Sequence, residues 1–202
     1  TQLKVVEPYW SKWMKKIPTL EDLSGSTQQE ILMLWQGLGY YSRGYNILNG
    51  SLYLVDYIGN KSSLNPNSWP KTLEEWTAIP GVGRTTAGSI ISSSFDLPTS
   101  ILDGNVKRIL SRLIGILDPI NINLSYLWSL SDLLLDRDNP RNFNQALMDL
   151  GANICKPRRP ICFNCPWKNR CFAYASGNPT QFPVKNAKKT IPFEVIGIGI
   201  VV

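Results

Sequence analysis

All four cysteines of the chain fall within one stretch of seventeen residues: Cys155, Cys162, Cys165 and Cys171. The spacing C-x6-C-x2-C-x5-C admits disulfide bonds, a structural zinc ion or an iron–sulfur cluster. Disulfides are disfavoured because no secretory signal is visible, and thiols inside the cell stay reduced. Zinc held by four thiolates usually has two close C-x2-C pairs, and only one is present here. A [4Fe–4S] cluster takes four thiolates from one compact loop, so the cluster and zinc both remain open.

A second candidate for chemistry is the carboxylate of Asp103, in the string LDGN at 102–105. Most aspartates in such a string are helix N-caps or turn residues, and a catalytic carboxylate is the alternative. The chain contains no histidine. Schemes that need a histidine base are therefore excluded, and acid–base chemistry falls to Asp, Glu, Tyr, Lys or Cys.

A third candidate is the string IPGVG at 79–83, which lies before a predicted helix that begins near Arg84. Two glycines two residues apart let the backbone take positive φ and approach a ligand closely. The helix that follows directs its free N–H groups and positive dipole end to the same place. The string predicts a phosphate-binding hairpin, although a G-x-G by itself is most often only a turn.

Positive charge is concentrated near the cysteines. The chain has 21 Lys+Arg against 15 Asp+Glu, a net charge of +6. From residue 155 to 189 there is no Asp or Glu, and the cations are Lys156, Arg158, Arg159, Lys168, Arg170, Lys185, Lys188 and Lys189. Such an unopposed positive field suits a phosphate backbone, although total charge alone is equally consistent with an ordinary basic surface.

The elements that must position these residues are predicted to be helices. Apolar residues recur at helical spacing, and alternation with period two is absent before residue 190. A capping box, Thr27 with Glu30, predicts the start of the second helix. The expected helices cover residues 3–14, 27 to about 38, 42–58, 73–79, 84–95, 105–116, 124–137 and 142–154, with a loop at 61–70. The main body is therefore predicted to be all-α.

The C-terminal part has a different composition. Residues 177–190 are rich in Pro and Lys and read as a linker, and 191–202 as the first strand of a separate domain. Both ends of the chain look cut, which predicts a fragment. No apolar run approaches the ~20 residues that span a membrane. We therefore expect a cytoplasmic protein, nucleoid-associated if bacterial, that is monomeric and has no membrane partner.

Together these motifs resemble the helix-hairpin-helix DNA glycosylases of the endonuclease III superfamily. The resemblance rests on IPGVG followed by RTTAG, on LDGNVKR at 102–108 and on the cysteine spacing. Two further strings, LWQGLGYYSR at 34–43 and FNQALMDLGA at 143–152, are similar to its adenine-specific branch. The resemblance implies a helical domain with the hairpin at 1–98 and a domain at 99–176 that binds a [4Fe–4S] cluster. The strand at 191–202 would open a truncated Nudix-like domain.

The resemblance also implies a function in base-excision DNA repair. The substrate would be double-stranded DNA with adenine mispaired with guanine or 8-oxoguanine. The enzyme would hydrolyse the N-glycosidic bond of that adenine and leave an abasic site. The alternatives are an endonuclease III-like pyrimidine or thymine-mismatch glycosylase, and a DNA-binding fragment without catalysis.

Roles for single residues follow from the same resemblance. Asp103 would stabilise positive charge on the sugar, and Asn105 would orient that carboxylate or the backbone beside it. Thr85 stands where bifunctional relatives carry a lysine that forms a Schiff base, so a monofunctional enzyme is expected. Tyr40 would enter the base stack as a wedge. Contacts with DNA are expected for Gln2, Tyr40, Gly81, Val82, Gly83, Arg84, Lys156, Arg158 and Arg159.

One catalytic group of the family has no counterpart in the chain. The resemblance places the glutamate that protonates the departing adenine just before Thr1. Glu7 is no substitute because it would lie about three helical turns too late. Loss of a general acid lowers rates by about 10²–10⁴-fold, so we expect this 202-residue chain to be inactive or nearly so.

Overall fold

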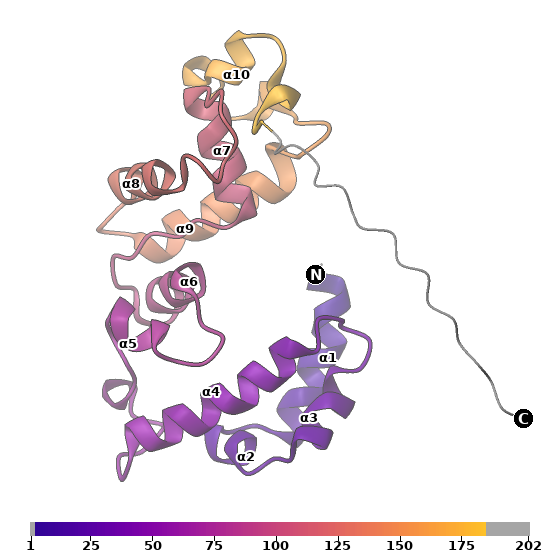
Figure 1. Cartoon of the computed structure of the whole chain (residues 1–202), viewed down its shortest axis with the longest axis vertical. Helices are drawn as coiled ribbons and strands as arrows, with labels where there is room; N and C mark the ends of the chain where they lie inside the picture. The colour runs from indigo at the N-terminus through magenta and orange to yellow at the C-terminus, as the bar shows by residue number, and fades with distance from the viewer. Residues whose placement is uncertain (1–2, 185–202) are drawn as a thin grey trace, which may run out of the picture. The chain divides into compact units, whose positions relative to one another are not determined.

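The computed structural model describes residues 3–184, and within this range the regular secondary structure is helical (Figure 1). Pro119 and Val184 form an isolated bridge, and no strand occurs among these residues. The prediction of an all-α main body is therefore confirmed. The predicted strand at 191–202 lies outside the described residues. None of the helices in the described part is long and apolar enough to cross a membrane.

The described chain forms two compact units. The first comprises residues 3–103 and 131–147, and the second comprises 104–130 and 148–184. Each unit is thus built from two stretches of chain, whereas the sequence predicted continuous ranges. The first unit contains α1 (Leu3–Lys16), α2 (Leu20–Ser24), α3 (Gln28–Trp35), α4 (Ser42–Ile58), η1 (Pro66–Ser68), α5 (Leu73–Thr77) and α6 (Arg84–Phe95).

The second unit contains α7 (Gly104–Ile114), η2 (Leu150–Ile154), η3 (Cys162–Asn164), η4 (Lys168–Arg170), α10 (Phe172–Ala175) and η5 (Pro179–Gln181). The helices α8 (Leu124–Leu134) and α9 (Pro140–Asp149) contribute residues to both units. The bounds of α4 and α6 are those that the sequence predicted. The predicted helix at 142–154 instead ends as an α-helix at Asp149 and continues as the π-turn η2.

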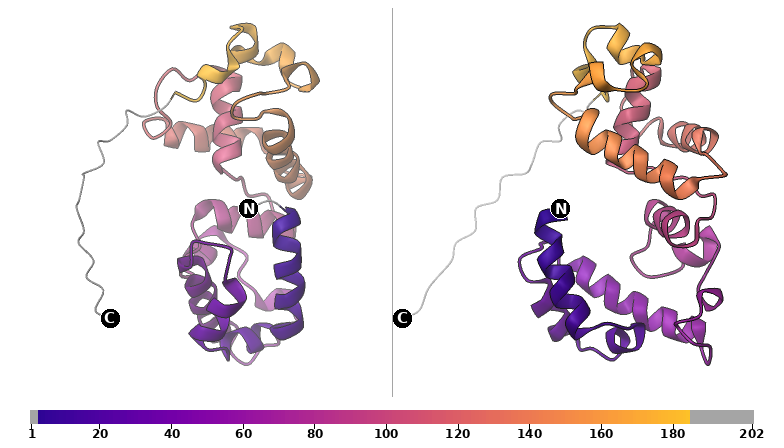
Figure 2. Two further views of the ribbon diagram at one scale, coloured as in Figure 1. Left: turned by 90° about the vertical axis from the view of Figure 1, so that its right-hand side faces the viewer. Right: turned by 180° about the vertical axis from the view of Figure 1, so that it is seen from behind.

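In the first unit, α4 is the long helix against which α2 and α3 pack (Figures 1 and 2). Ile31 and Leu34 of α3 meet Leu48 of α4 in one buried cluster. A second cluster joins Trp76 of α5 to Ile91 of α6. Burying each such side chain contributes about 1.5–3 kcal/mol, so these clusters fix where α5 and α6, and hence the hairpin between them, lie in this unit.

In the second unit, α7 is the central helix, and Figure 2 shows α10 beside it. Its apolar residues Val106, Ile109 and Leu110 are buried at the i, i+3, i+4 spacing of one helix face. Phe182, which the sequence placed in a linker, is only 4% exposed and packs edge-on against Phe172. Phe182 is therefore part of the packed core of this unit although it falls in the predicted linker.

Among the described residues, the sequence analysis missed two short α-helices, α2 and α10. Each is too short to show helical periodicity, with five and four residues. A local signal for α2 was nonetheless present. Thr19 and Asp22 form a capping box, the same pattern that correctly predicted the start of α3 from Thr27 and Glu30.

The capping box of α5 predicts a pH-dependent contribution to stability. Glu75 accepts hydrogen bonds from the Tyr57 hydroxyl and from the backbone N–H groups of Lys71 and Thr72, at 2.6, 2.9 and 2.9 Å. These bonds, led by that of Tyr57, lower the pKa of Glu75 from 4.5 to about 2. Because the folded-state pKa is the lower one, the stabilisation is complete above 4.5 and is lost as the pH falls through about 2.

We therefore expect Glu75→Gln to lower the free energy of unfolding by about 1–2 kcal/mol at neutral pH. Urea unfolding followed by circular dichroism measures the change, and the difference from the wild type should shrink as the pH falls below 4.5. Glu74→Gln is the matched control because it removes the same charge from the same first turn without breaking the capping box. Equal effects of the two variants at every pH would contradict this account.

Candidate functional site

The turn between α5 and α6 carries the predicted hairpin. Gly81 has a φ of 80°, and a Cβ there would come within 2.5 Å of the Asn46 side chain. The hairpin therefore requires glycine at 81. Both glycines of the string permit positive φ, but only Gly81 uses it, since the φ of Gly83 is −87°. Gly83 is the N-cap of α6, and that position takes extended backbone.

The N-terminus of α6 has no side-chain cap. In α2, α3 and α5 a threonine hydroxyl accepts a hydrogen bond from the first turn, whereas Gly83 has no side chain to do so. The first N–H groups of a helix have no intrahelical acceptor, and they point along the positive end of the helix dipole. The arrangement is therefore suited to binding an anion through backbone groups.

Thr85 lies in the first turn of α6 and links the hairpin to Asp103. Its hydroxyl donates a hydrogen bond of 3.2 Å to the carbonyl oxygen of Leu102. Leu102 is buried, and half-buried Asp103 follows it directly, at the residue before α7. The structure thus brings Thr85 to the backbone directly before Asp103.

Arg84, a predicted DNA contact, forms an ion pair. Its Nη2 lies 3.3 Å from Oδ2 of Asp132, and the other carboxylate oxygen, Oδ1, accepts a hydrogen bond from the Ser100 hydroxyl. Both charged side chains are nearly half exposed. An exposed pair of this kind contributes only about 0–1 kcal/mol, so the guanidinium is able to exchange its carboxylate partner for another anion.

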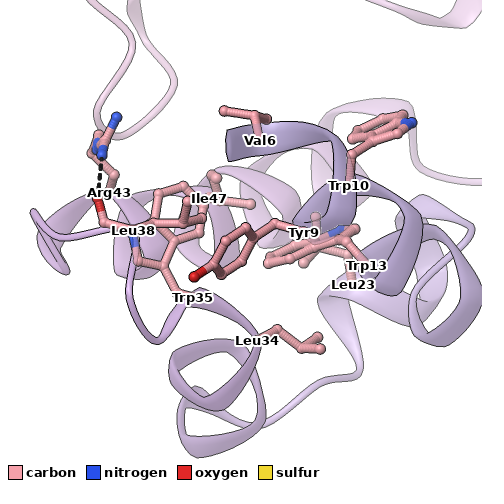
Figure 3. Close-up of a pocket in the computed structure, with 10 residues that line it drawn as sticks. All are labelled: Val6, Tyr9, Trp10, Trp13, Leu23, Leu34, Trp35, Leu38, Arg43 and Ile47. Carbon is pink, nitrogen blue, oxygen red and sulfur yellow. Dashed lines mark hydrogen bonds between the residues drawn. The ribbon is translucent and has the colours of Figure 1, made fainter. Parts of the chain in front are cut away.

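Tyr40 lies in the loop between α3 and α4. Its side chain is 81% exposed, and its φ is 47°. The loop borders a mostly apolar cavity of about 430 Å³, drawn in Figure 3 with Trp35, Leu38 and Arg43 on its edge. Tyr9 and Trp13 of α1 also line this cavity. The predicted wedge residue is therefore exposed, and its loop is supported by α1, α3 and α4.

In the second unit, the four cysteines and the side chain of Arg112 line one small cavity of about 30 Å³. None of the four forms a disulfide. Among residues 3–184, no three or more Cys, His, Asp or Glu side chains are grouped closely enough to hold a metal ion. The four cysteines thus line one space.

Burial raises the pKa of Cys162, and negative charge on the neighbouring Cys155 and Cys171 raises it further. Burial also raises the pKa of Cys165. The thiolate forms of these residues are therefore unfavourable without a positive charge between them, and Arg112 opposes only part of the effect on Cys162. A bound cationic centre would supply the missing charge.

Arg112 organises the backbone around these cysteines. Its side chain is only 2% exposed. The guanidinium donates to four carbonyl oxygens: Phe182 at 3.0 Å, Cys155 at 3.3 Å, Lys156 at 2.7 Å and Pro157 at 3.0 Å. A fifth contact, of 3.3 Å, reaches the sulfur of Cys155. One buried cation thus holds the residues after the first cysteine and the segment at Phe182.

Arg108, one helical turn earlier on α7, connects Asn105 to the same loop. Its Nη2 donates to Oδ1 of Asn105 at 2.8 Å and to the Gly151 carbonyl at 2.7 Å, and its Nε donates to the Cys155 carbonyl at 2.7 Å. Gly151 has no room for a side chain, because a Cβ would come within 2.5 Å of Asn105. Asn105 is thus held through Arg108 and close backbone packing.

Sequence reasoning missed the roles of Arg108 and Arg112. A signal existed for Arg112, which falls among the apolar positions of the buried face of α7. The predicted phosphate contacts Lys156, Arg158 and Arg159 are exposed on the loop between the first two cysteines. Gln2, the remaining predicted DNA contact, lies outside the described residues.

The fold and the hairpin define a helical protein with a helix-hairpin-helix motif. A family model for HhH-GPD superfamily base excision DNA repair proteins matches residues 1–121. The chain therefore belongs to this superfamily. Membership is consistent with an iron–sulfur cluster.

Several adenine DNA glycosylases are similar in sequence. The protein of Mus musculus is 43% identical over 177 residues, 86% of this chain and 33% of that protein. The protein of Buchnera aphidicola subsp. Baizongia pistaciae is 39% identical over 195 residues, 95% of this chain and 52% of that protein. The chain thus spans about a third to a half of the length of these relatives.

Solved structures confirm the fold. A thermostable thymine-DNA glycosylase matches with a TM-score of 0.73 at 25% identity, over 85% of this chain and 76% of that chain. An endonuclease III–DNA complex matches with a TM-score of 0.69 at 21% identity, over 86% of this chain and 78% of that chain. The predicted helix-hairpin-helix glycosylase fold is therefore confirmed.

We expect Arg112→Lys to destabilise the protein by about 3–5 kcal/mol, because one ammonium group cannot replace a guanidinium that satisfies buried carbonyls of separate segments. Urea unfolding measures the loss. Arg170→Lys in η4 is the matched control, since Arg170 is exposed and its replacement should change stability by less than about 0.5 kcal/mol. A similar small effect of both variants would show that Arg112 does not organise the loop.

Proposed function

We propose that the protein is a monofunctional adenine DNA glycosylase that acts on double-stranded DNA with adenine opposite guanine or 8-oxoguanine. The hydrogen bond from Thr85 to the Leu102 carbonyl carries the proposal, because it joins the anion-binding start of α6 to the backbone beside Asp103. The identity of 43% and 39% to adenine DNA glycosylases supports adenine as the substrate base.

Binding begins at the phosphate backbone. The uncapped N-terminus of α6 accepts a phosphate through the backbone N–H groups after Gly83, and Arg84 adds a charge. The exposed cations Lys156, Arg158 and Arg159 strengthen binding without reading sequence. Tyr40 enters the base stack and offsets the unstacking energy of the adenine that is flipped out.

Asp103 then stabilises the transition state. Breaking the bond between adenine and deoxyribose develops positive charge on the sugar, and a fixed carboxylate lowers the energy of that charge. The departing base also needs a proton from a general acid. Asn105, held by Arg108, orients the start of α7 from which Asp103 projects.

The reaction stops at the abasic site because the hairpin offers no amine. Residue 85 is threonine, and no lysine occurs from residue 72 to 106. A Schiff base with the sugar requires a lysine or another amine at this place. Water therefore completes the hydrolysis, and the strand stays intact until it is treated with alkali.

The four cysteines fit a [4Fe–4S] cluster better than zinc. Four-thiolate zinc sites usually have two close C-x2-C pairs and this chain has one, whereas four thiolates from one compact loop that line a single cavity suit a cluster. When bound, the cluster supplies positive charge that keeps four thiolates ionised and cross-links the loop. The residues of the protein have two further roles. Arg112 and Arg108 hold the backbone of the cysteine loop, and the exposed cations of that loop bind phosphate.

The test of this function is single-turnover adenine release from a duplex with adenine opposite 8-oxoguanine, using the full-length protein that the gene encodes. We expect strand breaks only after alkali and no trapping by borohydride. Asp103→Asn should lower the rate by at least about 10³-fold and leave DNA binding intact, whereas the control Asp118→Asn should behave as wild type.

Other outcomes would replace the proposal. Thymine release from a G·T duplex without adenine release would identify a thymine-mismatch enzyme, and breaks without alkali would identify a lyase. Unchanged adenine release by Asp103→Asn would remove Asp103 from the mechanism.

Metal analysis tests the cluster. We expect four irons and four sulfides per chain in protein purified without oxygen, and Cys162→Ser should lower the iron content and the free energy of unfolding. One zinc per chain and no sulfide would instead identify a structural zinc site.

A further inference from the structure

Tyr40 combines high exposure with an unfavourable backbone conformation. Its side chain is 81% exposed, and its φ of 47° lies in the left-handed region that bulky side chains rarely adopt. Nothing in the burial of the ring explains why this conformation persists. Surrounding contacts must therefore hold the loop, and such strain is often found where a side chain has a function.

The loop backbone is held from both flanking helices. From α3, the indole N–H of Trp35 donates to the Gly39 carbonyl at 3.0 Å. From α4, Nη2 of Arg43 lies 3.4 Å from the carbonyl oxygens of both Leu38 and Gly39. Figure 3 shows the contact with Leu38. The two carbonyls before Tyr40 are therefore tied to the side chains of Trp35 and Arg43.

The guanidinium of Arg43 also lies beside two aromatic rings. Its Cζ is 5.4 Å from the centroid of the Trp35 ring and 5.4 Å from that of the Tyr40 ring, within the range of a cation–π contact. Trp35 in turn meets Trp13 of α1 edge-on, with centroids 6.2 Å apart. A continuous row of contacts thus runs from α1 through Trp35 and Arg43 to the exposed ring.

We propose that Arg43 is a positioning residue that holds the Tyr40 ring ready to enter the base stack. The inference rests on the proposed function, since it takes Tyr40 as the wedge. A side chain that is ordered before binding loses less conformational entropy on insertion. Arg43 therefore acts through Tyr40, and its guanidinium contacts the ring and the loop carbonyls.

The test is a double-mutant cycle with Arg43→Met, Tyr40→Ala and the double variant. Met keeps the length of the apolar stem and removes the charged plane. All proteins carry Asp103→Asn, so that the DNA stays intact. The readouts are the Kd for a duplex with adenine opposite 8-oxoguanine at two salt concentrations, and the fluorescence of 2-aminopurine beside that pair. Lys61→Met controls for the loss of one positive charge, since Lys61 is exposed in the loop after α4.

We expect Arg43→Met to raise Kd about 3–10-fold and to reduce the unstacking signal of 2-aminopurine, in line with the loss of an ordered aromatic contact. In the Tyr40→Ala background the same substitution should change Kd by less than about twofold. The salt dependence of Kd should stay as in wild type, and Lys61→Met should change neither readout.

Two results would overturn the inference. An equal loss in both backgrounds, with a salt slope reduced by about one, would make Arg43 a direct phosphate contact. An unchanged Kd and fluorescence in Arg43→Met would show that Tyr40 needs no positioning. Because both readouts report binding without base release, they remain valid even if the assay for adenine excision fails.

Discussion

The guanidinium of Arg112 is charged and nearly inaccessible to water, and its hydrogen bonds go to backbone carbonyls of two segments far apart in sequence. Loops around a metal centre expose many backbone groups that no helix or sheet can satisfy, and buried groups of this kind must find partners. Arg112 and Arg108 supply five of these partners from one face of α7. The cysteine loop therefore depends on α7 for its shape, whatever the four thiols bind.

At the hairpin, by contrast, no side chain caps the backbone N–H groups of the first turn of α6. Three other helices of this unit, α2, α3 and α5, begin with threonine capping boxes, in which the threonine hydroxyl accepts a hydrogen bond from the third N–H group of the first turn. At α6 a glycine leaves the first turn without a side-chain cap, so that an external anion can approach. One unit thus contains capped helix ends that stabilise the fold and, at the hairpin, an end without a side-chain cap that suits anion binding. The difference between them is a single side chain at the N-cap.

Much of this was available from the sequence. Helical periodicity and capping boxes predicted most helices, because these signals depend on neighbours within four residues of each other. The cysteine spacing, the glycine hairpin and the aspartate before α7 were recognisable for the same reason, as short contiguous patterns. Short helices such as α2 and α10 escaped because four or five residues carry too little periodicity. Which of the two hairpin glycines takes positive φ was not evident from the sequence, because the N-cap of α6 places extended backbone at Gly83.

The sequence by itself thus determined the helical class, the candidate cysteines and the candidate carboxylate. Only the tertiary structure decided which distant groups meet: Thr85 with the Leu102 carbonyl, and Arg112 with the backbone near Phe182. It also decided that Tyr40 stands exposed beside Arg43 and Trp35. These contacts join residues through packing rather than through local propensity. Their partners are mostly backbone carbonyls, which are chemically alike at every position, so no pattern of side-chain types could have identified them.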